Sequence, residues 1–177
     1  MPKTTTTSVT PPPAAVARDP HWAAKLDRLR SRKRPIAKLT ICDDDTIRQA
    51  LTRAKAEHDT AVALGDEDSQ KTTAQALEAA QAAFDEAAIV LTFRALPSGE
   101  FEALKAEHPP TEAQAEDGQG MNLDTLGPEL VAAASIDGLT VEDAAGFLKT
   151  WGTGEATQLF FAAWDVQTHV RADLGKG

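Results

Sequence analysis

Two helix-forming runs with heptad spacing, separated by one polar turn, constrain the fold of this chain more than any other feature. The first run steps alternately by four and three residues through Ile47, Leu51, Ala54, His58 and Ala61. The second run, residues 69–88, repeats the pattern with Leu77, Ala80, Phe84 and Ala87. Such steps put each set on one helix face, and the polar turn that begins at Gly65 separates the two runs. The sequence therefore predicts an antiparallel α-helical hairpin with a narrow, alanine-rich contact.

Short β-type runs flank this hairpin, over residues 36–42 and 89–95. Both alternate between two faces, and their apolar faces carry Leu39 and Ile41 in the first run and Ile89, Leu91 and Phe93 in the second. Because the hairpin returns the chain to its starting point, we expect the two strands to pair antiparallel at its base. A two-stranded ribbon is unstable alone, so helices of the C-terminal half should cover its apolar face.

Capping residues and prolines divide the C-terminal half into short helices. The predicted helices lie between Ser98 and Pro109-Pro110, Thr111 and Asp117-Gly118, Pro128 and Asp137-Gly138, Thr140 and Gly152, and Thr153 and Ala172. The stripe of the last helix comprises Leu159, Ala163, Val166 and Val170. Large side chains are concentrated in this half, which predicts that the main hydrophobic core is C-terminal.

The N-terminal segment differs in composition. Residues 1–18 contain a threonine run and three successive prolines, which predict a disordered tail because too little apolar surface is available to offset the entropy of ordering. Asp19-Pro20 then predicts the start of a helix over residues 20–32. The stripe of this helix comprises Trp22, Leu26 and Leu29.

The expected architecture is mainly α. It consists of a disordered N-terminal tail (1–18), a basic helix with the antiparallel hairpin bracketed by two short β-strands (19–96), and a C-terminal bundle of short helices (97–177). Aromatic residues make up 5% of the chain, and alanine, which favours helices but buries little area, is abundant. Both features favour long helices with thin contacts over a sheet-based core.

Charge is distributed unevenly along the chain. Residues 1–42 contain nine Lys or Arg and two Asp or Glu, a net charge of +7; the other 135 residues contain nine basic and 25 acidic side chains, a net charge of −16, which sums to the −9 of the whole chain. A basic segment of this kind can bind nucleic acid or dock on the acidic remainder. The cluster from Arg28 to Arg34 has no interleaved aromatic residues for base stacking, so nucleic acid is not the expected partner.

No motif in the sequence carries a recognisable chemistry. The chain has no phosphate-binding glycine loop and no nucleophile elbow. Cys42 is its only cysteine, which excludes an intramolecular disulfide and fits a reducing cytoplasm. Asp43-Asp44-Asp45 is interpreted as a helix cap rather than a metal site. We therefore expect a non-enzymatic protein with no catalytic residue, metal or cofactor, and no membrane partner, because no apolar run approaches the ~20 residues of a membrane span.

Most of the chain nevertheless resembles one family. Residues 20–177 are similar to the tail assembly chaperones of long-tailed (siphovirus) actinobacterial phages, including those of Streptomyces hosts. The residues that carry the resemblance are Phe93-Arg94-Ala95-Leu96-Pro97, Phe101-Glu102-Ala103-Leu104, His108-Pro109-Pro110-Thr111, Asn122-Leu123-Asp124, Leu130-Val131-Ala132-Ala133-Ala134-Ser135 and Trp151 through Glu155 into Leu159. Arg34-Pro35 and the following strand are also similar. These motifs are structural rather than catalytic.

The resemblance implies a protein that is made in the infected cell and binds the long helical tape measure protein. It also implies recruitment of tail tube protein, localisation in the host cytoplasm, and absence from the mature virion. Members of the family are often made in two lengths by ribosomal frameshifting, for which the codons of Gly175-Lys176 could form a slippery heptamer. Partners would then include a longer form of this chain, and a homo-oligomer is compatible with the same function.

A chaperone of this kind needs apolar surface that its own fold does not cover. The expected partner-binding residues are Trp22, Trp151, Phe160, Phe161 and Trp164. The alternative stays open that the last four belong to the core and that Trp22 docks on the body of the chain. Two other functions also stay open. One is a structural virion or head–tail connector protein, and the other is a nucleic-acid-binding regulator that uses the basic residues 18–38.

Overall fold

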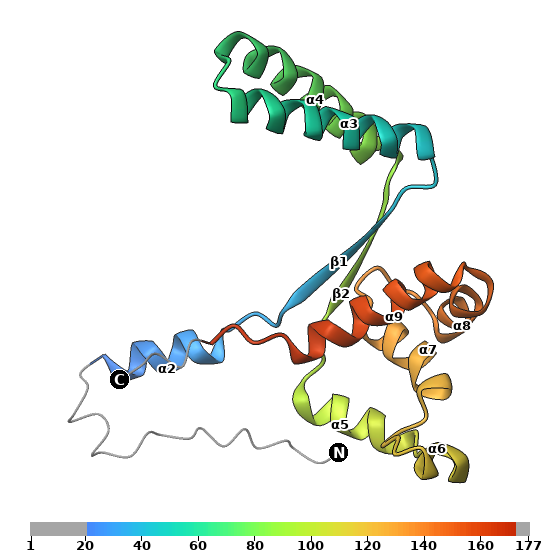
Figure 1. The fold of residues 1–177 in the computed structure, drawn as a ribbon. Helices are drawn as coiled ribbons and strands as arrows, with labels where there is room; N and C mark the ends of the chain where they lie inside the picture. Colours follow the sequence, from blue (N-terminus) through green and yellow to red (C-terminus); the bar gives the residue numbers. More distant parts are fainter. Residues whose placement is uncertain (1–20, 173–177) are drawn as a thin grey trace. The chain divides into compact units, whose positions relative to one another are not determined.

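The computed structural model describes residues 21–172, which belong to two compact units, one ending at Arg34 and one beginning at Pro35. Figure 1 shows the elements in chain order: α2 (Trp22–Arg30), β1 (Ile36–Ile41), α3 (Asp45–Leu64), α4 (Glu67–Ala87), β2 (Ile89–Arg94), α5 (Ser98–Glu107), α6 (Glu112–Glu116), α7 (Leu123–Ala134), α8 (Val141–Thr150) and α9 (Thr153–Thr168). The described chain is mainly helical with one antiparallel strand pair, as predicted. The predicted disordered tail (1–18), Asp19-Pro20 and Gly175-Lys176 lie outside the described residues.

Helix α2 forms most of the described part of the first unit. It begins at Trp22, directly after His21, and has no side-chain cap at its N-terminus. Trp22 and Leu26 are half-buried, whereas Leu29 is 53% exposed. The predicted apolar stripe of α2 is therefore half-buried in its first turns, whereas its last residue, Leu29, is exposed to solvent.

In the second unit, β1 and β2 pair antiparallel at the base of the helical hairpin, as predicted. The apolar face consists of the opposed pairs Ala37–Phe93, Leu39–Leu91 and Ile41–Ile89. Helix α9 packs on this face (Figure 1), together with residues of the C-terminal core. Phe93 is fully buried and Ile89 is 60% exposed, so the helical cover becomes thinner toward the hairpin.

Helices α3 and α4 form the predicted hairpin. One carboxylate oxygen of Asp44 accepts hydrogen bonds from the backbone N–H groups of Thr46 (2.8 Å) and Ile47 (3.1 Å), which satisfies two donors that a helix start leaves unpaired. The interpretation of the aspartate run as a helix cap is thus confirmed. Gly65 ends α3 in the left-handed conformation, with φ of +70°.

The contact between the two hairpin helices is thin. The buried residues of α3 are Leu51, Ala54 and Ala61, and α4 has none. His58 contributes a polar link across the contact, with Nδ1 3.2 Å from Thr73 Oγ1. The prediction that Ala87 lies in this contact is wrong: it is exposed, because α4 ends there and the chain turns into β2.

The C-terminal helices follow the predicted caps in part. Thr111 with Gln114 and Thr140 with Asp143 form complete capping boxes. The predicted cap at Ser98 is wrong, because Ser98 is already the first residue of α5 and its side chain caps nothing.

Two further helix boundaries differ from the prediction. Helix α7 begins at Leu123 rather than Pro128, because the Asn122 side chain accepts hydrogen bonds from the first backbone N–H groups, and Pro128 lies inside the helix. The proline removes only one helical hydrogen bond near this start. Helix α7 also ends at Ala134, before Asp137-Gly138, and α9 ends at Thr168, which leaves Val170 76% exposed.

The main core lies in the C-terminal half, as predicted, but it includes the end of β2. Its buried residues are Phe93, Ala95, Leu126, Leu130, Val131, Ala134, Ala144, Leu159, Ala163 and Val166. A β-bridge between Phe93 and Ser135 joins β2 to the segment that follows α7. The strand ribbon and the C-terminal helices therefore share one core, and the predicted boundary between residues 96 and 97 falls inside the second compact unit.

Candidate partner-binding surface

Aromatic side chains form a row where α9 meets α5. Trp164 contacts Phe101 edge-to-face and stacks on Phe160, with ring centroids 5.7 Å apart in both pairs. Phe160 in turn contacts Phe161 edge-on at 5.7 Å, and Phe161 is 44% exposed. Each aromatic pair stabilises the fold by about 0.5–1.5 kcal/mol beyond the effect of its buried area. The row is therefore well ordered, and it ends in the exposed ring of Phe161.

Trp151 lies at the corner between α8 and α9 and is the C-cap residue of α8. Its ring stacks on Phe147 with centroids 4.8 Å apart and an interplanar angle of 21°. The Trp151 side chain also lines two separate cavities. Trp151 therefore contributes to both of these cavities.

The larger cavity is an open groove of about 740 Å³ between α7 and the corner of α8 and α9. Its apolar lining includes Leu123, Gly127, Pro128, Leu148, Trp151 and Phe160. Gly127 lies in the groove wall, where a Cβ atom would make ordinary contacts with Leu148 at 3.5 Å and with the Phe160 ring at 3.6 Å. Asp124 and Lys149 add one charge of each sign to the lining.

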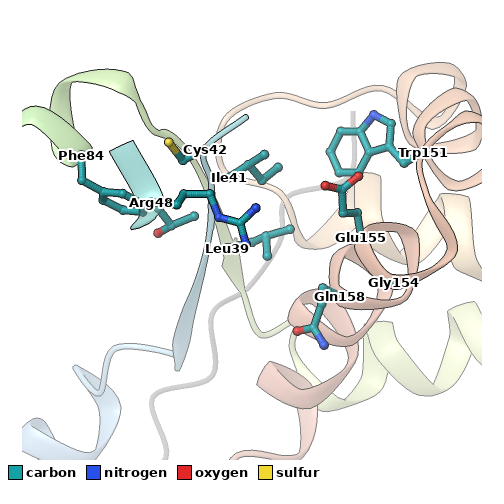
Figure 2. A pocket seen from close by; sticks show the side chains of 10 residues that line it. Leu39, Ile41, Cys42, Arg48, Phe84, Trp151, Gly154, Glu155 and Gln158 are labelled. Atoms are coloured by element: carbon teal, nitrogen blue, oxygen red, sulfur yellow. The ribbon is translucent and has the colours of Figure 1, made fainter. Parts of the chain in front are cut away.

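The smaller cavity, of about 260 Å³, lies between β1 and the N-terminal turns of α9. Figure 2 shows its apolar side chains, Leu39, Ile41, Phe84 and Trp151, and its polar side chains, Arg48, Glu155 and Gln158. The Arg48 guanidinium lies 3.2 Å from the Asp45 carboxylate, whereas Glu155 has no ion-pair partner within residues 21–172. The free thiol of Cys42 is buried at the edge of this cavity.

The structure brings four of the five predicted binding residues into one unit. Trp151 and Phe160 line the larger groove, Trp164 packs behind Phe160, and Phe161 is exposed. None of these four is among the fully buried core residues, although Trp151, Phe160 and Trp164 pack against that core. Trp22 belongs to the first unit. A binding role for all five residues stays a prediction.

His108 has a structural role that the sequence pattern did not reveal. It is buried, with 8% exposure, and its Nδ1 lies 2.9 Å from Thr125 Oγ1. On the other side, Nε2 lies 3.1 Å from Glu129 Oε2, at an angle too bent for a hydrogen bond. The His108 carbonyl also accepts a hydrogen bond of 2.9 Å from the Asn122 N–H.

Hydroxyl, imidazole and carboxylate thus occur in the order found in a hydrolytic triad. Two observations favour a structural role over catalysis. The Thr125 hydroxyl also lies 3.3 Å from the Asn122 carbonyl, and none of the three residues lines either cavity, where a substrate would bind. The contacts of His108 with Thr125 and Glu129 hold the end of α5 against α7, and we call this group the His108 latch. A sequence signal could not have found it, because the partners are brought together by the packing of two helices.

Two aspartates that cap helices have shifted pKa values. Side-chain hydrogen bonds from Ser69 and Thr140 lower the pKa of Asp66 and Asp143, respectively, and backbone N–H groups of the same two residues add to the shift. Within residues 21–172, no group of three or more His, Cys, Asp or Glu could hold a metal ion, and the helices are too short or too polar to cross a lipid bilayer. In comparisons with known proteins, no family model, curated protein or solved structure matches the chain.

Proposed function

We propose that this chain is a non-enzymatic tail assembly chaperone of a long-tailed phage. It binds the tape measure protein in the host cytoplasm, promotes assembly of the tail tube, and is absent from the mature virion. The sequence resemblance suggests this function, and the open groove lined by Trp151 and Phe160 supports it best, because it offers aromatic surface that the fold leaves uncovered.

The groove has the chemistry that a helical client requires. An amphipathic helix binds in a groove by placing apolar side chains at successive turns against apolar walls. Leu123, which lines the groove, and Phe161, which contacts the Phe160 ring, are each 44% exposed and offer further apolar surface to a partner. The opposite charges of Asp124 and Lys149 would favour one orientation of the client helix. Tryptophan and other large aromatic residues often dominate the affinity of such interfaces.

A matched pair of substitutions tests the groove. Leu123 is the first residue of α7 and lines the groove, and Val141 is the first residue of α8 and is absent from its lining. Their exposures are 44% and 47%. Aspartate is well tolerated at a first helical turn, so Leu123→Asp and Val141→Asp should both preserve the fold.

The experiment is co-expression of each variant with the tape measure protein of the same phage, followed by affinity purification. We expect the wild-type chain and Val141→Asp to keep the tape measure protein soluble and to co-purify with it. Leu123→Asp should weaken the complex by about thirty-fold, because it replaces an exposed apolar side chain of the groove lining with a charged one. Failure of the wild-type chain to retain the tape measure protein would refute the proposal.

Two further measurements address the other expected partners and the first rival. Pull-down with tail tube protein, and detection of a longer frameshifted product of the same gene, test the proposed assembly. Mass spectrometry of purified particles tests the structural alternative: stoichiometric presence of this chain in the virion would identify it as a virion or head–tail connector protein instead.

One observation favours a second candidate function, binding of nucleic acid by the basic segment. Lys25, Arg28 and Leu29 of α2 line one surface depression together with Arg32, which follows the helix. This arrangement presents positive charge on one side of the segment. This function predicts DNA binding that weakens steeply with salt and is lost on deletion of residues 1–35. Absence of a mobility shift at low salt would eliminate it.

A further inference from the structure

The strand ribbon has two outer edges, and the hydrogen-bond pattern identifies the residues that face each edge. The Ala95 N–H donates to the Pro35 carbonyl over 3.0 Å, so the odd-numbered residues of β1 direct their backbone groups toward β2. The backbone groups of Ile36, Lys38 and Thr40 therefore point away from β2, along the outer edge of β1.

The two edges differ in their partners. On β2, the Thr92 carbonyl accepts a hydrogen bond of 3.0 Å from the Ile136 N–H, and the Thr92 N–H donates to the Asp137 carboxylate. The segment after α7 thus covers the outer edge of β2 at Thr92. Within residues 21–172, no corresponding backbone hydrogen bond is made on the outer edge of β1. An open edge of this kind can pair with a further strand.

The smaller cavity lies beside this open edge. Residues 39–42 of the β1 side form one wall, and Gly154, Glu155 and Gln158 of α9 form the other. Figure 2 shows the cavity between these two walls. Because side chains alternate along a strand, a strand added to β1 would direct every second side chain toward α9. A cavity of about 260 Å³ can hold one large apolar side chain between Leu39 and Trp151.

The opposite face of the ribbon is basic. Lys38 and Arg94 lie on it, beside Ile36, which is 56% exposed. Neither cation has an ion-pair partner within residues 21–172, although the chain beyond residue 42 carries a net charge of −16 (nine basic, 25 acidic). Side chains of an added strand that face this side would therefore be favoured if they were acidic.

Because of Lys38, we do not expect a second copy of this chain to pair with the open edge of β1. An antiparallel pairing of two β1 edges that engages Ile36, Lys38 and Thr40 of both copies would place the two Lys38 side chains directly opposite each other. Like charges in this position are destabilising, and lysine on an edge strand is a common means of preventing self-association.

We propose that the open edge of β1 binds an extended segment of a partner protein by strand addition. The segment places one large apolar side chain in the smaller cavity and acidic side chains on the face of Lys38. Backbone hydrogen bonds supply the affinity, and the cavity and the lysine supply the specificity. This site does not depend on the proposed chaperone function, because its variants leave the larger groove unchanged.

The test uses the full chain and a short fluorescein-labelled peptide that alternates valine with glutamate and has phenylalanine at its central valine position. Thr40→Pro removes an outward N–H without altering the pairing with β2, and Val90→Pro is the matched control on the other edge. Gly154→Trp fills the cavity from a position with open space, and Gly146→Trp, also open, is its control on α8. Lys38→Glu reverses the charge.

In fluorescence anisotropy, we expect each of three variants to weaken binding about ten-fold. Thr40→Pro does so by removing a backbone hydrogen bond, Gly154→Trp by occupying the cavity, and Lys38→Glu by placing like charges opposite each other. Val90→Pro and Gly146→Trp should bind like the wild-type chain. A peptide with lysine in place of glutamate should bind more weakly, and peptide binding should slow hydrogen exchange at the amides of Lys38 and Thr40.

Equal affinity of all variants, or no binding of the glutamate peptide to a wild-type chain with native circular dichroism, would overturn the proposal. Sedimentation of the chain alone provides an independent check on the occupant. If the wild-type chain is a dimer that Thr40→Pro dissociates, the edge binds a second copy and the proposed acidic strand is wrong.

Discussion

Replacement of Phe93 by alanine tests whether the ribbon and the C-terminal helices form one cooperative structure. Phe93 lies on β2, yet its side chain is fully buried among residues of α7 and α9. Its backbone pairs with Ala37 on one side and bridges to Ser135 on the other. The substitution leaves these backbone contacts in place and removes only the ring.

The expected cost follows from this complete burial. Truncation of a buried phenylalanine to alanine lowers the free energy of unfolding by about 3–5 kcal/mol, through lost transfer free energy and the cavity left behind. Domains of ordinary stability unfold with about 5–15 kcal/mol in total. For a unit of this size, the loss corresponds to a decrease in Tm of about 6–20 °C.

The assay is urea unfolding followed by tryptophan fluorescence in a Trp22→Phe background, so that the signal comes from Trp151 and Trp164 of the second unit. The matched control is Ile89→Ala, on the same strand and the same face but 60% exposed, for which we expect a loss of about 1 kcal/mol or less. Equal effects of the two substitutions, or a loss below about 1 kcal/mol for Phe93→Ala, would show that the ribbon is not part of the core.

Three further predictions concern local conformation and pH. Gly65→Ala should destabilise the hairpin by about 1 kcal/mol or more in thermal unfolding, because φ is +70° at this position; an unchanged Tm would contradict the left-handed helix end. Gly127→Ala should be neutral or stabilise by up to about 1 kcal/mol, since the nearest side-chain atom to an added Cβ lies at an ordinary 3.5 Å; a large loss in the same assay would contradict the packing around Phe160. For Asp143, the hydrogen bond from Thr140 lowers the folded-state pKa, so its stabilisation is fully present above the ordinary aspartate pKa of about 3.9 and is lost as the pH falls through the lowered value. Asp143→Asn should therefore weaken the acid dependence of the urea midpoint, and identical pH profiles for variant and wild type would contradict the assignment.

Local signals were sufficient for much of the fold. The helical hairpin and the capping boxes depend on residues close in sequence, and the apolar faces of the strands, with Leu39 on one and Leu91 on the other, follow from an alternation with a fixed period. Boundaries failed where two local signals competed. Pro128 is a typical first helical residue, but Asn122 provides an earlier cap and α7 begins there.

The candidate surface was predictable only in part. Large aromatic residues in the C-terminal half marked Trp151 and Phe160, but their sequence positions did not show that both would line a groove with Gly127 of another helix. The His108 latch and the open edge of β1 had no sequence signal. Both depend on contacts between residues that are far apart in the chain.

The sequence by itself determined which segments are helices and strands, the pairing of the two strands, and the location of the core in the C-terminal half. These follow from helix and strand periodicity and from caps that act over a few residues. Only the tertiary structure decided that Phe93 belongs to the helical core, that the outer edge of β2 is covered at Thr92 while that of β1 is open, and where the two cavities lined by Trp151 lie. The physical reason is that burial and edge coverage depend on how separate elements pack, and local sequence patterns do not encode the gaps between them.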